Sequence, residues 1–265
     1  MARQIWKILK SVNRTPEILR CTRETAQWAE ISAAYTGLAR LPYPHMLRLR
    51  GGERIRLEEL QDLKAFWQIF LRKVYRVRAT DRVILDLGAN IGLFTLYAAR
   101  RAPQARVVAL EPFPSTFRRL LETVHDHHLD DRVTCLNIAV TGASGVRIMP
   151  TTPIPSQSRF LAPADSGRSG TEVVGKTLET VLDENDLDRV DLLKIDIEGS
   201  EYEVLLSTPP SALARISRIA MEYHADGGPY SKQQLFEHLR GAGFTVAWDM
   251  WDAKGYGVTE MVFRS

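Results

Sequence analysis

The chain has 265 residues, enough to bury one sizeable core with a smaller appended element. Its 45% hydrophobic and 25% charged residues are ordinary for a globular protein, and a net charge of +3 argues against a large basic surface for nucleic acid. Two cysteines are too few for a disulfide framework, and neither a secretory signal nor an apolar run of about 18 residues is present, so a cytoplasmic protein without a transmembrane segment is expected.

The first 79 residues are predicted to form a helical and hairpin extension. Its elements, in chain order, are helices within 1–42, a hairpin of 46–50 and 54–57 around Gly51-Gly52, and a helix over 58–76. Between Ile5 and Val12, apolar residues recur at helical spacing with basic residues between them. Such a segment suits either an anionic membrane surface or packing on its own domain or a dimer mate, and packing is favoured.

From residue 82 onward, short apolar runs alternate with helical patterns. The predicted strands are 83–87, 107–110, 133–140, 190–195, 216–223, 245–250 and 256–263, and the predicted helices are 93–101, 115–127, 178–184, 201–206 and 232–242. This alternation predicts an α/β, Rossmann-like domain over 80–265, with a mostly parallel central sheet and helices on both faces. Residues 151–170, rich in Ser, Pro, Thr and Gly, are expected to form a long loop suited to covering a substrate.

A glycine turn follows the first strand of this domain, in the run Asp86-Leu87-Gly88-Ala89-Asn90-Ile91-Gly92. Gly88 and Gly92 let the backbone approach a ligand closely because they have no Cβ. Glu111 ends the next strand, just before Pro112, and an acid at that point can accept the hydroxyls of a ribose. The two features together predict a cofactor that contains a nucleoside.

The details of the turn favour S-adenosylmethionine over NAD. Asn90 stands where the dinucleotide pattern has its middle glycine, so a pyrophosphate would be crowded. Asp86 suits an amino-bearing, cationic ligand better than a phosphate. The end of the third predicted strand, at Asn137 and Ala139, is the expected place for the adenine. The candidate cofactor-binding residues are Asp86, Gly88, Ala89, Asn90, Gly92, Glu111, Pro112, Asn137, Ala139 and Asp196.

With these motifs the sequence resembles the FkbM family of methyltransferases. The resemblance covers about residues 80 to 225 and rests on 86–92, Glu111-Pro112, the string from Leu193 to Glu201, and Glu222-Tyr223-His224. It implies a class I methyltransferase fold, S-adenosylmethionine as the cofactor and a hydroxyl of a sugar, glycolipid or secondary metabolite as the acceptor. It says little about the first 80 residues or about 151–170, where substrate identity is expected to vary.

The reaction is expected at the ends of the fourth and fifth core strands. An alcohol acceptor needs a base within hydrogen-bond reach, and Asp196 ends a strand close to where the methyl group would project. Lys194 lies inside an apolar strand and is expected to pair with a carboxylate such as Asp196 or Glu222. Glu201 suits either this site or the N-terminal turn of a helix. The candidate catalytic residues are Asp196, His224, Lys194, Glu198 and Glu222.

Other readings remain open at this point. A nicotinamide-dependent oxidoreductase would need the turn that Asn90 disrupts, and a methyltransferase of RNA ribose would need a basic groove with stacking aromatics. A noncatalytic binding module with the same fold is a third. No dedicated metal spacing is present, so no metal is predicted, although three carboxylates and a histidine could hold a divalent cation. The expected partner is a small-molecule or glycan acceptor rather than nucleic acid, with a homodimer possible.

Overall fold

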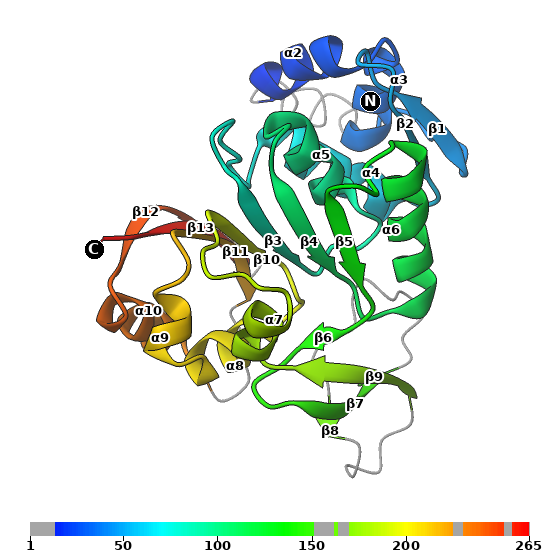
Figure 1. The fold of residues 1–265 in the computed structure, drawn as a ribbon. Helices are drawn as coiled ribbons and strands as arrows, with labels where there is room; N and C mark the ends of the chain where they lie inside the picture. The colour runs from blue at the N-terminus through cyan, green and yellow to red at the C-terminus, as the bar shows by residue number, and fades with distance from the viewer. Residues whose placement is uncertain (1–13, 151–161, 164–169, 225–229, 252–255, 265) are drawn as a thin grey trace. The chain divides into compact units, whose positions relative to one another are not determined.

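The computed structural model describes residues 14–150, 162–163, 170–224, 230–251 and 256–264 (Figure 1). The chain divides between Val74 and Tyr75 into two compact units. The apolar and basic segment from Ile5 to Val12 lies outside the described residues. Among those that are described, no helix is both long and apolar enough to cross a membrane.

Among its described residues, the first unit contains helices and a hairpin. Its elements are α2 (Thr15–Glu24), α3 (Trp28–Thr36), β1 (His45–Arg48), β2 (Arg54–Leu57), α4 (Leu60–Phe66) and η1 (Trp67–Arg72). Strands β1 and β2 pair in antiparallel fashion around Gly51-Gly52. The core of the unit includes the buried Trp67, whose ring stacks on Tyr35 with centroids 4.1 Å apart and whose indole nitrogen donates to Glu17.

The helix expected over 58–76 is shorter and changes its winding. It starts as α4 and continues from Trp67 as a π-helical segment, which ends at Arg72. Lys73 adopts a left-handed backbone conformation, with φ of 57°, and this stops the helix. The residues that follow Lys73 are therefore not helical, and Tyr75 is the first residue of the second unit, in the segment that leads to its first strand.

The second unit is built on a seven-stranded sheet in the order β12-β13-β11-β10-β3-β4-β5. The strands are β3 (Val83–Leu87), β4 (Arg106–Leu110), β5 (Val133–Leu136), β10 (Leu192–Ile195), β11 (Arg218–His224), β12 (Phe244–Trp251) and β13 (Tyr256–Phe263). The five strands from β5 to β11 run parallel, and β13 and β12 add an antiparallel edge. This order confirms the predicted Rossmann-like fold, and it brings the carboxyl ends of β3, β4, β10 and β11 to one edge of the sheet.

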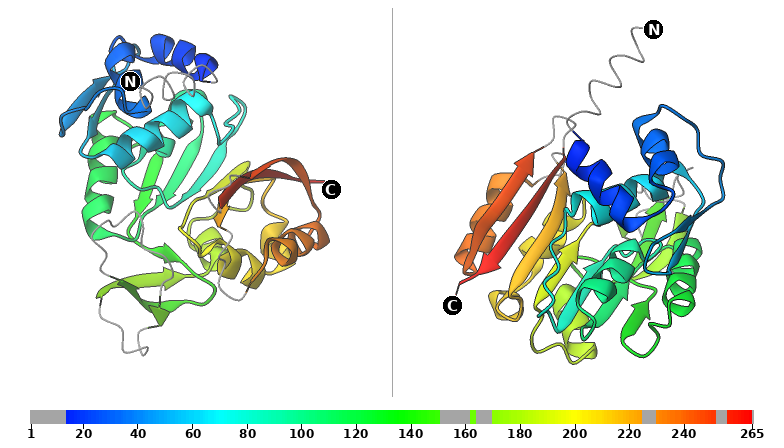
Figure 2. Two further views of the ribbon diagram at one scale, coloured as in Figure 1. Left: turned by 180° about the vertical axis from the view of Figure 1, so that it is seen from behind. Right: turned by 90° about the horizontal axis from the view of Figure 1, so that it is seen from above.

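Helices cover both faces of this sheet (Figure 2). They are α5 (Leu93–Arg101), α6 (Pro114–Asp126), α7 (Leu178–Glu184), α8 (Glu201–Ser207), α9 (Pro210–Leu213) and α10 (Lys232–Gly241). Because strand side chains alternate between faces, Leu85, Leu193 and Met221 share one face, where they pack with buried residues of α7 to α10. Asp86, Lys194 and Glu222 point to the opposite face, where Thr95 of α5 bonds Asp86. The polar residues of the predicted site thus share a face.

The third core strand, expected over 133–140, is two separate strands. The chain leaves the large sheet after Leu136, where the Asn137 side-chain amide donates to the carbonyls of Glu111 and Pro112 at 2.8 and 3.0 Å. Residues Ala139–Val140 then form β6 in a different sheet. The expectation that Ala139 closes a core strand is therefore wrong.

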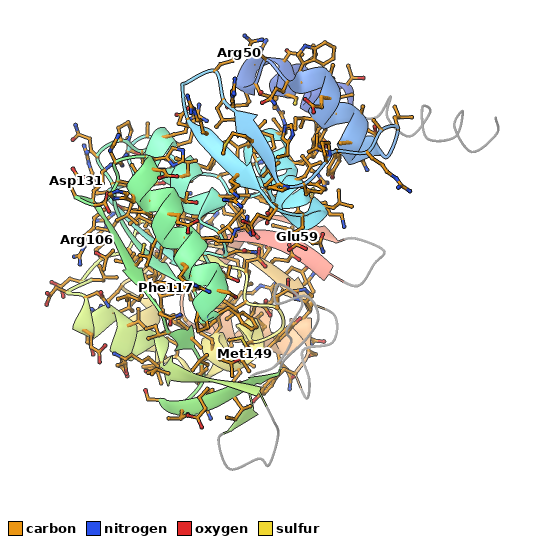
Figure 3. All side chains as sticks on the ribbon, turned by 90° about the vertical axis from the view of Figure 1, so that its right-hand side faces the viewer. Arg50, Glu59, Arg106, Phe117, Asp131 and Met149 are labelled. Carbon is orange, nitrogen blue, oxygen red and sulfur yellow. The ribbon has the colours of Figure 1, made fainter. Side chains whose placement is uncertain are left out.

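A four-stranded sheet that the sequence did not predict follows, in the order β6-β9-β7-β8. Strands β7 (Gly145–Pro150) and β9 (Gly170–Lys176) pair in antiparallel register, and β8 is the short segment Ala162–Pro163. Met149 of β7, labelled in Figure 3, is buried with Ala139 and Val173, and the partly buried Phe113 packs against them. Most of the loop expected over 151–170 lies outside the described residues, and the pair Pro150 and Gly170 marks where it leaves and rejoins the sheet.

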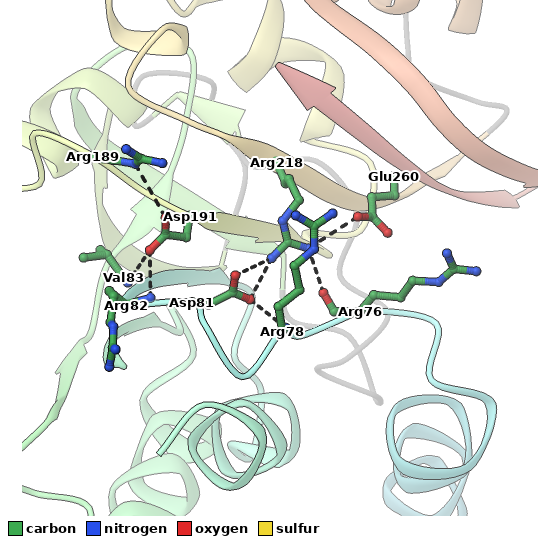
Figure 4. A network of polar contacts seen from close by, with 9 residues as sticks. All are labelled: Arg76, Arg78, Asp81, Arg82, Val83, Arg189, Asp191, Arg218 and Glu260. Atoms are coloured by element: carbon green, nitrogen blue, oxygen red, sulfur yellow. Dashed lines mark hydrogen bonds and ion pairs between the residues drawn. The ribbon is translucent and has the colours of Figure 1, made fainter. Parts of the chain in front are cut away.

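A buried ion network lies at the start of β11 (Figure 4). The guanidinium of Arg218 contacts Asp81 at 2.6 Å and Glu260 of β13 at 3.3 Å, and all three residues are buried. The same guanidinium donates to the carbonyl oxygen of Arg76 at 3.0 Å. One side chain therefore ties the segment before β3 to two strands of the sheet.

Candidate active site

The turn after β3 lies directly against the end of β10. Gly88 and Ala89 donate their amides to the carbonyl of Leu110 at 3.0 and 2.9 Å, which fixes the turn onto β4. Gly88 has a φ of 75°, and a Cβ placed on it would come within 1.9 Å of the carbonyl oxygen of Asp196. Only glycine fits at this contact. The predicted cofactor turn and the predicted base are thus backbone neighbours.

Asn90 and Gly92 complete the turn at its helical end. Both have left-handed backbone conformations, with φ of 51° and 85°, and Gly92 immediately precedes the first residue of α5. Ala89 and Gly92 are buried, and Asn90 is partly exposed. The run from Gly88 to Gly92 therefore forms the cradle that the sequence indicated at the beginning of this helix.

Glu111 is held beside this turn by backbone amides. One carboxyl oxygen accepts from Asn90 N at 2.9 Å and the other from Phe113 N at 3.0 Å. The residue is only 5% exposed, and burial raises the pKa of its carboxyl group to about 7, against the lowering effect of the two amides. Each oxygen still has a lone pair to offer, because a carboxylate can accept about four hydrogen bonds.

Lys194 and Asp86 form a buried ion pair across neighbouring strands. The two residues stand opposite each other in the register of β10 and β3, and Lys194 Nζ lies 2.9 Å from Asp86 Oδ1. Lys194 also donates to the carbonyls of Gly88 at 2.7 Å and Leu87 at 3.2 Å, while Thr95 donates to the other oxygen of Asp86 at 2.7 Å. The expectation of Asp196 or Glu222 as the partner is wrong, because Asp86 is directly opposite.

This pair changes what the two residues can do. The ammonium of Lys194 has three N–H donors and makes three contacts, two of them to carbonyl oxygens at the start of the glycine turn. Lys194 therefore holds the backbone of this turn in place. Burial works to lower the pKa of Lys194, but the carboxyl groups of Asp86, Asp196 and Glu111 together outweigh burial, and the pKa is raised. Asp86 is fully buried, with one carboxyl oxygen in the ion pair with Lys194 and the other accepting from Thr95.

Asp196 is partly exposed at the end of β10 and has a partner that the sequence did not reveal. The phenol of Tyr75 donates to Asp196 Oδ2 at 3.0 Å. Tyr75 is 2% exposed and its ring meets that of Phe94 edge to face, with centroids 5.5 Å apart. Burial and the neighbouring carboxylates, that of Asp196 first, raise the pKa of the Tyr75 phenol well above its ordinary value.

His224 gathers the remaining acids at the end of β11. Its Nε2 lies 3.7 Å from both Glu198 and Glu222, and its Nδ1 lies 3.5 Å from Glu201. Burial works to lower the pKa of His224, but the nearby carboxylates, that of Glu201 first, outweigh it and raise the pKa. The imidazolium form is thereby favoured, and this form donates hydrogen bonds instead of accepting a proton.

Glu222 and Glu201 differ in what they offer this cluster. Burial, together with the carboxylates of Asp196, Glu198 and Glu201, raises the pKa of Glu222 to about 9. Glu222 therefore carries a proton near neutral pH. Glu201 is fully buried in the first turn of α8, and its carboxylate accepts hydrogen bonds from the loop amides of Gly199 at 3.1 Å and Ile197 at 3.3 Å.

Within the described residues, no three His, Cys, Asp or Glu side chains are arranged to hold a metal ion.

Of the two residues expected near an adenine, Asn137 directly follows β5, whereas Ala139 lies in the small sheet. Asn137 is exposed and its amide closes the Glu111-Pro112 turn, so it supports Glu111 from outside. Ala139 is buried in the small sheet, opposite Gly175. The other candidates are brought together at the ends of β3, β4, β10 and β11.

Comparison with known proteins agrees with this geometry. The sequence pattern of the methyltransferase FkbM domain matches residues 86–246. The 31-O-demethyl-FK506 methyltransferase FkbM of Streptomyces tacrolimicus is 30% identical over 206 residues, which cover 67% of this chain and 77% of that protein. The hexuronic acid methyltransferase AglP of Haloferax volcanii is 24% identical over 189 residues, covering 68% of this chain and 75% of that protein.

One relative is much longer than this chain. The AMB antimetabolite synthetase AmbE of Pseudomonas aeruginosa is 32% identical over 245 residues, which are 75% of this chain but only 11% of that protein. The fold, the glycine turn and these similarities define a Rossmann-like methyltransferase. The chain belongs to the FkbM family of methyltransferases.

Proposed function

We propose that this protein transfers a methyl group from S-adenosylmethionine to a hydroxyl group of a sugar, glycolipid or secondary metabolite. The observation that carries the proposal is the contact between Gly88 and Asp196. This contact supports the proposal because the glycine turn and a partly exposed carboxylate lie side by side at the carboxyl edge of the sheet. A donor held by the turn and an acceptor held at the strand ends would meet there.

The residues present fit this cofactor. Glu111 is a buried carboxyl group that is held in place by two backbone amides and still has lone pairs for two more donors. A ribose supplies two neighbouring hydroxyl donors, which suit that arrangement. The cradle from Gly88 to Gly92 would contact the part of the cofactor next to the ribose. Lys194 holds the cradle through its hydrogen bond to the carbonyl oxygen of Gly88, and Lys194 is itself paired with Asp86. Dinucleotide binding is not favoured, because Asn90 occupies the turn.

The chain's own residues would handle the acceptor proton. When bound, S-adenosylmethionine supplies an activated methyl group on a sulfonium, whose bonding electrons stay with sulfur as the methyl group leaves. The new bond forms with an electron pair of the acceptor oxygen, and Asp196 takes the proton that this oxygen loses. Protonated Glu222, as a hydrogen-bond donor, is assigned to acceptor orientation, together with His224 and the partly exposed Glu198.

The acceptor class is supported by two relatives. The name of one describes methylation at an oxygen of FK506, and that of the other a hexuronic acid, so a metabolite and a sugar acid are both represented. Both proteins align with about two thirds of this chain. A small-molecule or glycan hydroxyl is therefore proposed in preference to nucleic acid, and a homodimer remains part of the proposal.

The experiment has two stages. Calorimetric titration with S-adenosylmethionine, and with NAD in parallel, is expected to show binding of S-adenosylmethionine alone. The protein is then incubated with isotopically labelled cofactor and a panel of sugars, glycolipids and polyketide alcohols, and methylated products are identified by mass spectrometry. Binding of NAD alone would overturn the proposal.

Asp196→Asn tests the assignment of the base. The substitution keeps the size of the side chain but removes its basicity, so cofactor affinity is expected to stay within about twofold and turnover to fall by about 100-fold or more. Retained turnover would remove Asp196 from the reaction.

A further inference from the structure

Tyr75 is the one side chain for which a hydrogen bond to the Asp196 carboxylate is found in the described part of the chain. The Tyr75 hydroxyl group donates to Oδ2 at 3.0 Å. The other carboxylate oxygen, Oδ1, takes no part in this hydrogen bond. The residue is 2% exposed, so its hydroxyl group has little access to solvent and depends on this acceptor. A buried phenol paired with a half-exposed carboxylate fixes the orientation of the carboxylate.

The surroundings keep the phenol protonated. Three carboxyl groups lie close enough to affect it, those of Asp196, Glu222 and Asp86, and together with burial they raise its pKa well above the ordinary value. The ammonium of Lys194 lies 5.7 Å from the Tyr75 ring, but it is bonded to Asp86. Tyr75 therefore acts as a hydrogen-bond donor over the whole range in which enzymes are normally assayed.

The backbone on which Tyr75 stands is itself held. The carbonyl oxygen of the next residue, Arg76, accepts a hydrogen bond from Arg218 at 3.0 Å (Figure 4). The guanidinium of Arg76 lies 5.3 Å from the centre of the Trp248 ring. Arg218 is fixed in turn by Asp81 and Glu260. The segment that carries Tyr75 is therefore held by Arg218 at the start of β11, the end of that strand opposite to the active site. Asp81, which lies in the same segment, is one of the residues that contact Arg218.

We infer that Tyr75 is a positioning residue for methyl transfer, which holds Asp196 Oδ2 so that Oδ1 is directed to the acceptor hydroxyl group. This inference rests on the proposed function, in which Asp196 takes the acceptor proton. The proton moves only from the acceptor to Asp196, and Tyr75 keeps its own. Its contribution is to orient the carboxylate.

Tyr75→Phe removes the hydroxyl group and keeps the ring against Phe94. We expect kcat to fall on the order of tenfold, the size of one hydrogen bond to a charged group, with the affinity for S-adenosylmethionine unchanged. The acidic limb of the pH–rate profile is expected to move to higher pH, because the ionised carboxylate loses a donor. Tyr223→Phe is the matched control, since Tyr223 is also buried and donates to an aspartate, Asp249, at 2.7 Å. It should change neither quantity.

A double substitution separates this inference from the proposed function. If Tyr75 acts through Asp196, adding Tyr75→Phe to Asp196→Asn has no further effect on single-turnover rates. Suppose that Tyr75→Phe has the kcat and pH profile of the unsubstituted protein while Asp196→Asn is inactive. The assignment of Asp196 as the base is then kept, and the positioning role of Tyr75 is wrong. If each substitution lowers the rate by the same factor whether or not the other is present, Tyr75 does not act through Asp196, and this result also overturns the inference. Full turnover by Asp196→Asn would instead overturn the proposed base.

Discussion

The carboxyl group of Glu111 combines deep burial with a pKa of about 7, raised mainly by desolvation. Its two backbone amides hold it in place, but they do not offset the cost of ionising it away from water. Hydroxyl donors from a bound ligand would favour the ionised form. Ligand binding at this residue should therefore be linked to the loss of a proton.

The affinity for S-adenosylmethionine is expected to depend on pH in a definite direction. If the ionised form of Glu111 binds the ribose, affinity is constant above about pH 8 and falls by up to about tenfold per pH unit below about 7. Calorimetry at several pH values, in buffers of different ionisation enthalpy, measures both the affinity and the proton released. Glu111→Gln should bind about 10- to 150-fold more weakly at pH 8 and lose this pH dependence. A pH dependence that survives in Glu111→Gln would place its origin elsewhere.

Individual residues show where the sequence was sufficient as a guide. The acid after an apolar strand was enough to select Glu111, which the structure places beside the glycine turn. The partner of Lys194 could not be chosen from the sequence, because it depends on which strands are neighbours. Asp86 became the partner only when β3 and β10 paired in register. Tyr75 was missed because the apolar pattern before it predicted a helix through residue 76, and no strand-end signal marked it.

At the scale of elements, the turn after β3 and the end of β10 behave as one unit. The closest approach is between Gly88 and the carbonyl oxygen of Asp196, where a Cβ would lie 1.9 Å away. Neither side of that contact is a flexible side chain, so a larger residue must displace backbone. Because the same backbone carries the cradle and the proposed base, both would be displaced together.

Gly88→Ala is accordingly expected to abolish cofactor binding and turnover together. The added methyl group collides with the end of β10, and the φ of 75° is itself unfavourable for alanine. Binding is measured by calorimetry and methyl transfer by product analysis. Gly241→Ala is the matched control, since a Cβ there meets no atom within 4 Å. A Gly88→Ala protein that binds and turns over normally would show that the two elements can separate.

Elements with strong patterns were predicted, and the weaker ones were not. The strands and helices of the large sheet were placed to within a few residues, because their apolar runs are bounded by Gly and Pro. The small sheet was missed, since the predicted third strand absorbed β6, and β9 is mostly exposed. What separates β5 from β6 is the side chain of Asn137, bonded to the Glu111-Pro112 turn, and strand patterns do not show such a contact.

At the scale of the second unit, Arg218 links parts of the chain that are far apart in sequence. Its contacts join Arg76 and Asp81, before the first strand of the sheet, to Glu260 in the last. Removing one member of a buried ion network leaves a charge without its full set of partners, and this is costly away from water. The network therefore fixes the edge of the sheet that lies opposite the strand ends of the active site.

Asp81→Ala is expected to lower the free energy of unfolding by about 3 kcal/mol, the lower end for a broken buried pair, because Glu260 still faces Arg218. Unfolding in urea, followed by circular dichroism, measures the change. Asp183→Ala serves as the control, since it removes an aspartate paired with Arg215 at the surface. That loss should cost less than about 1 kcal/mol. Equal costs for the two substitutions would mean that the buried network does not stabilise the unit.

The antiparallel pairing of β7 and β9 has a consequence for how proteins of this kind can diversify. The two strands pair as far as Pro150 and Gly170, so the segment between them, which includes β8, starts and ends at neighbouring positions of the small sheet. The free-energy cost of closing a longer connection between fixed ends grows only with the logarithm of its length. Insertions and exchanges between these positions are therefore inexpensive, and they leave the pairing of the large sheet untouched. Natural variants and laboratory chimeras could thus exchange this segment while they keep the large sheet, whose strand ends carry the residues of the candidate active site.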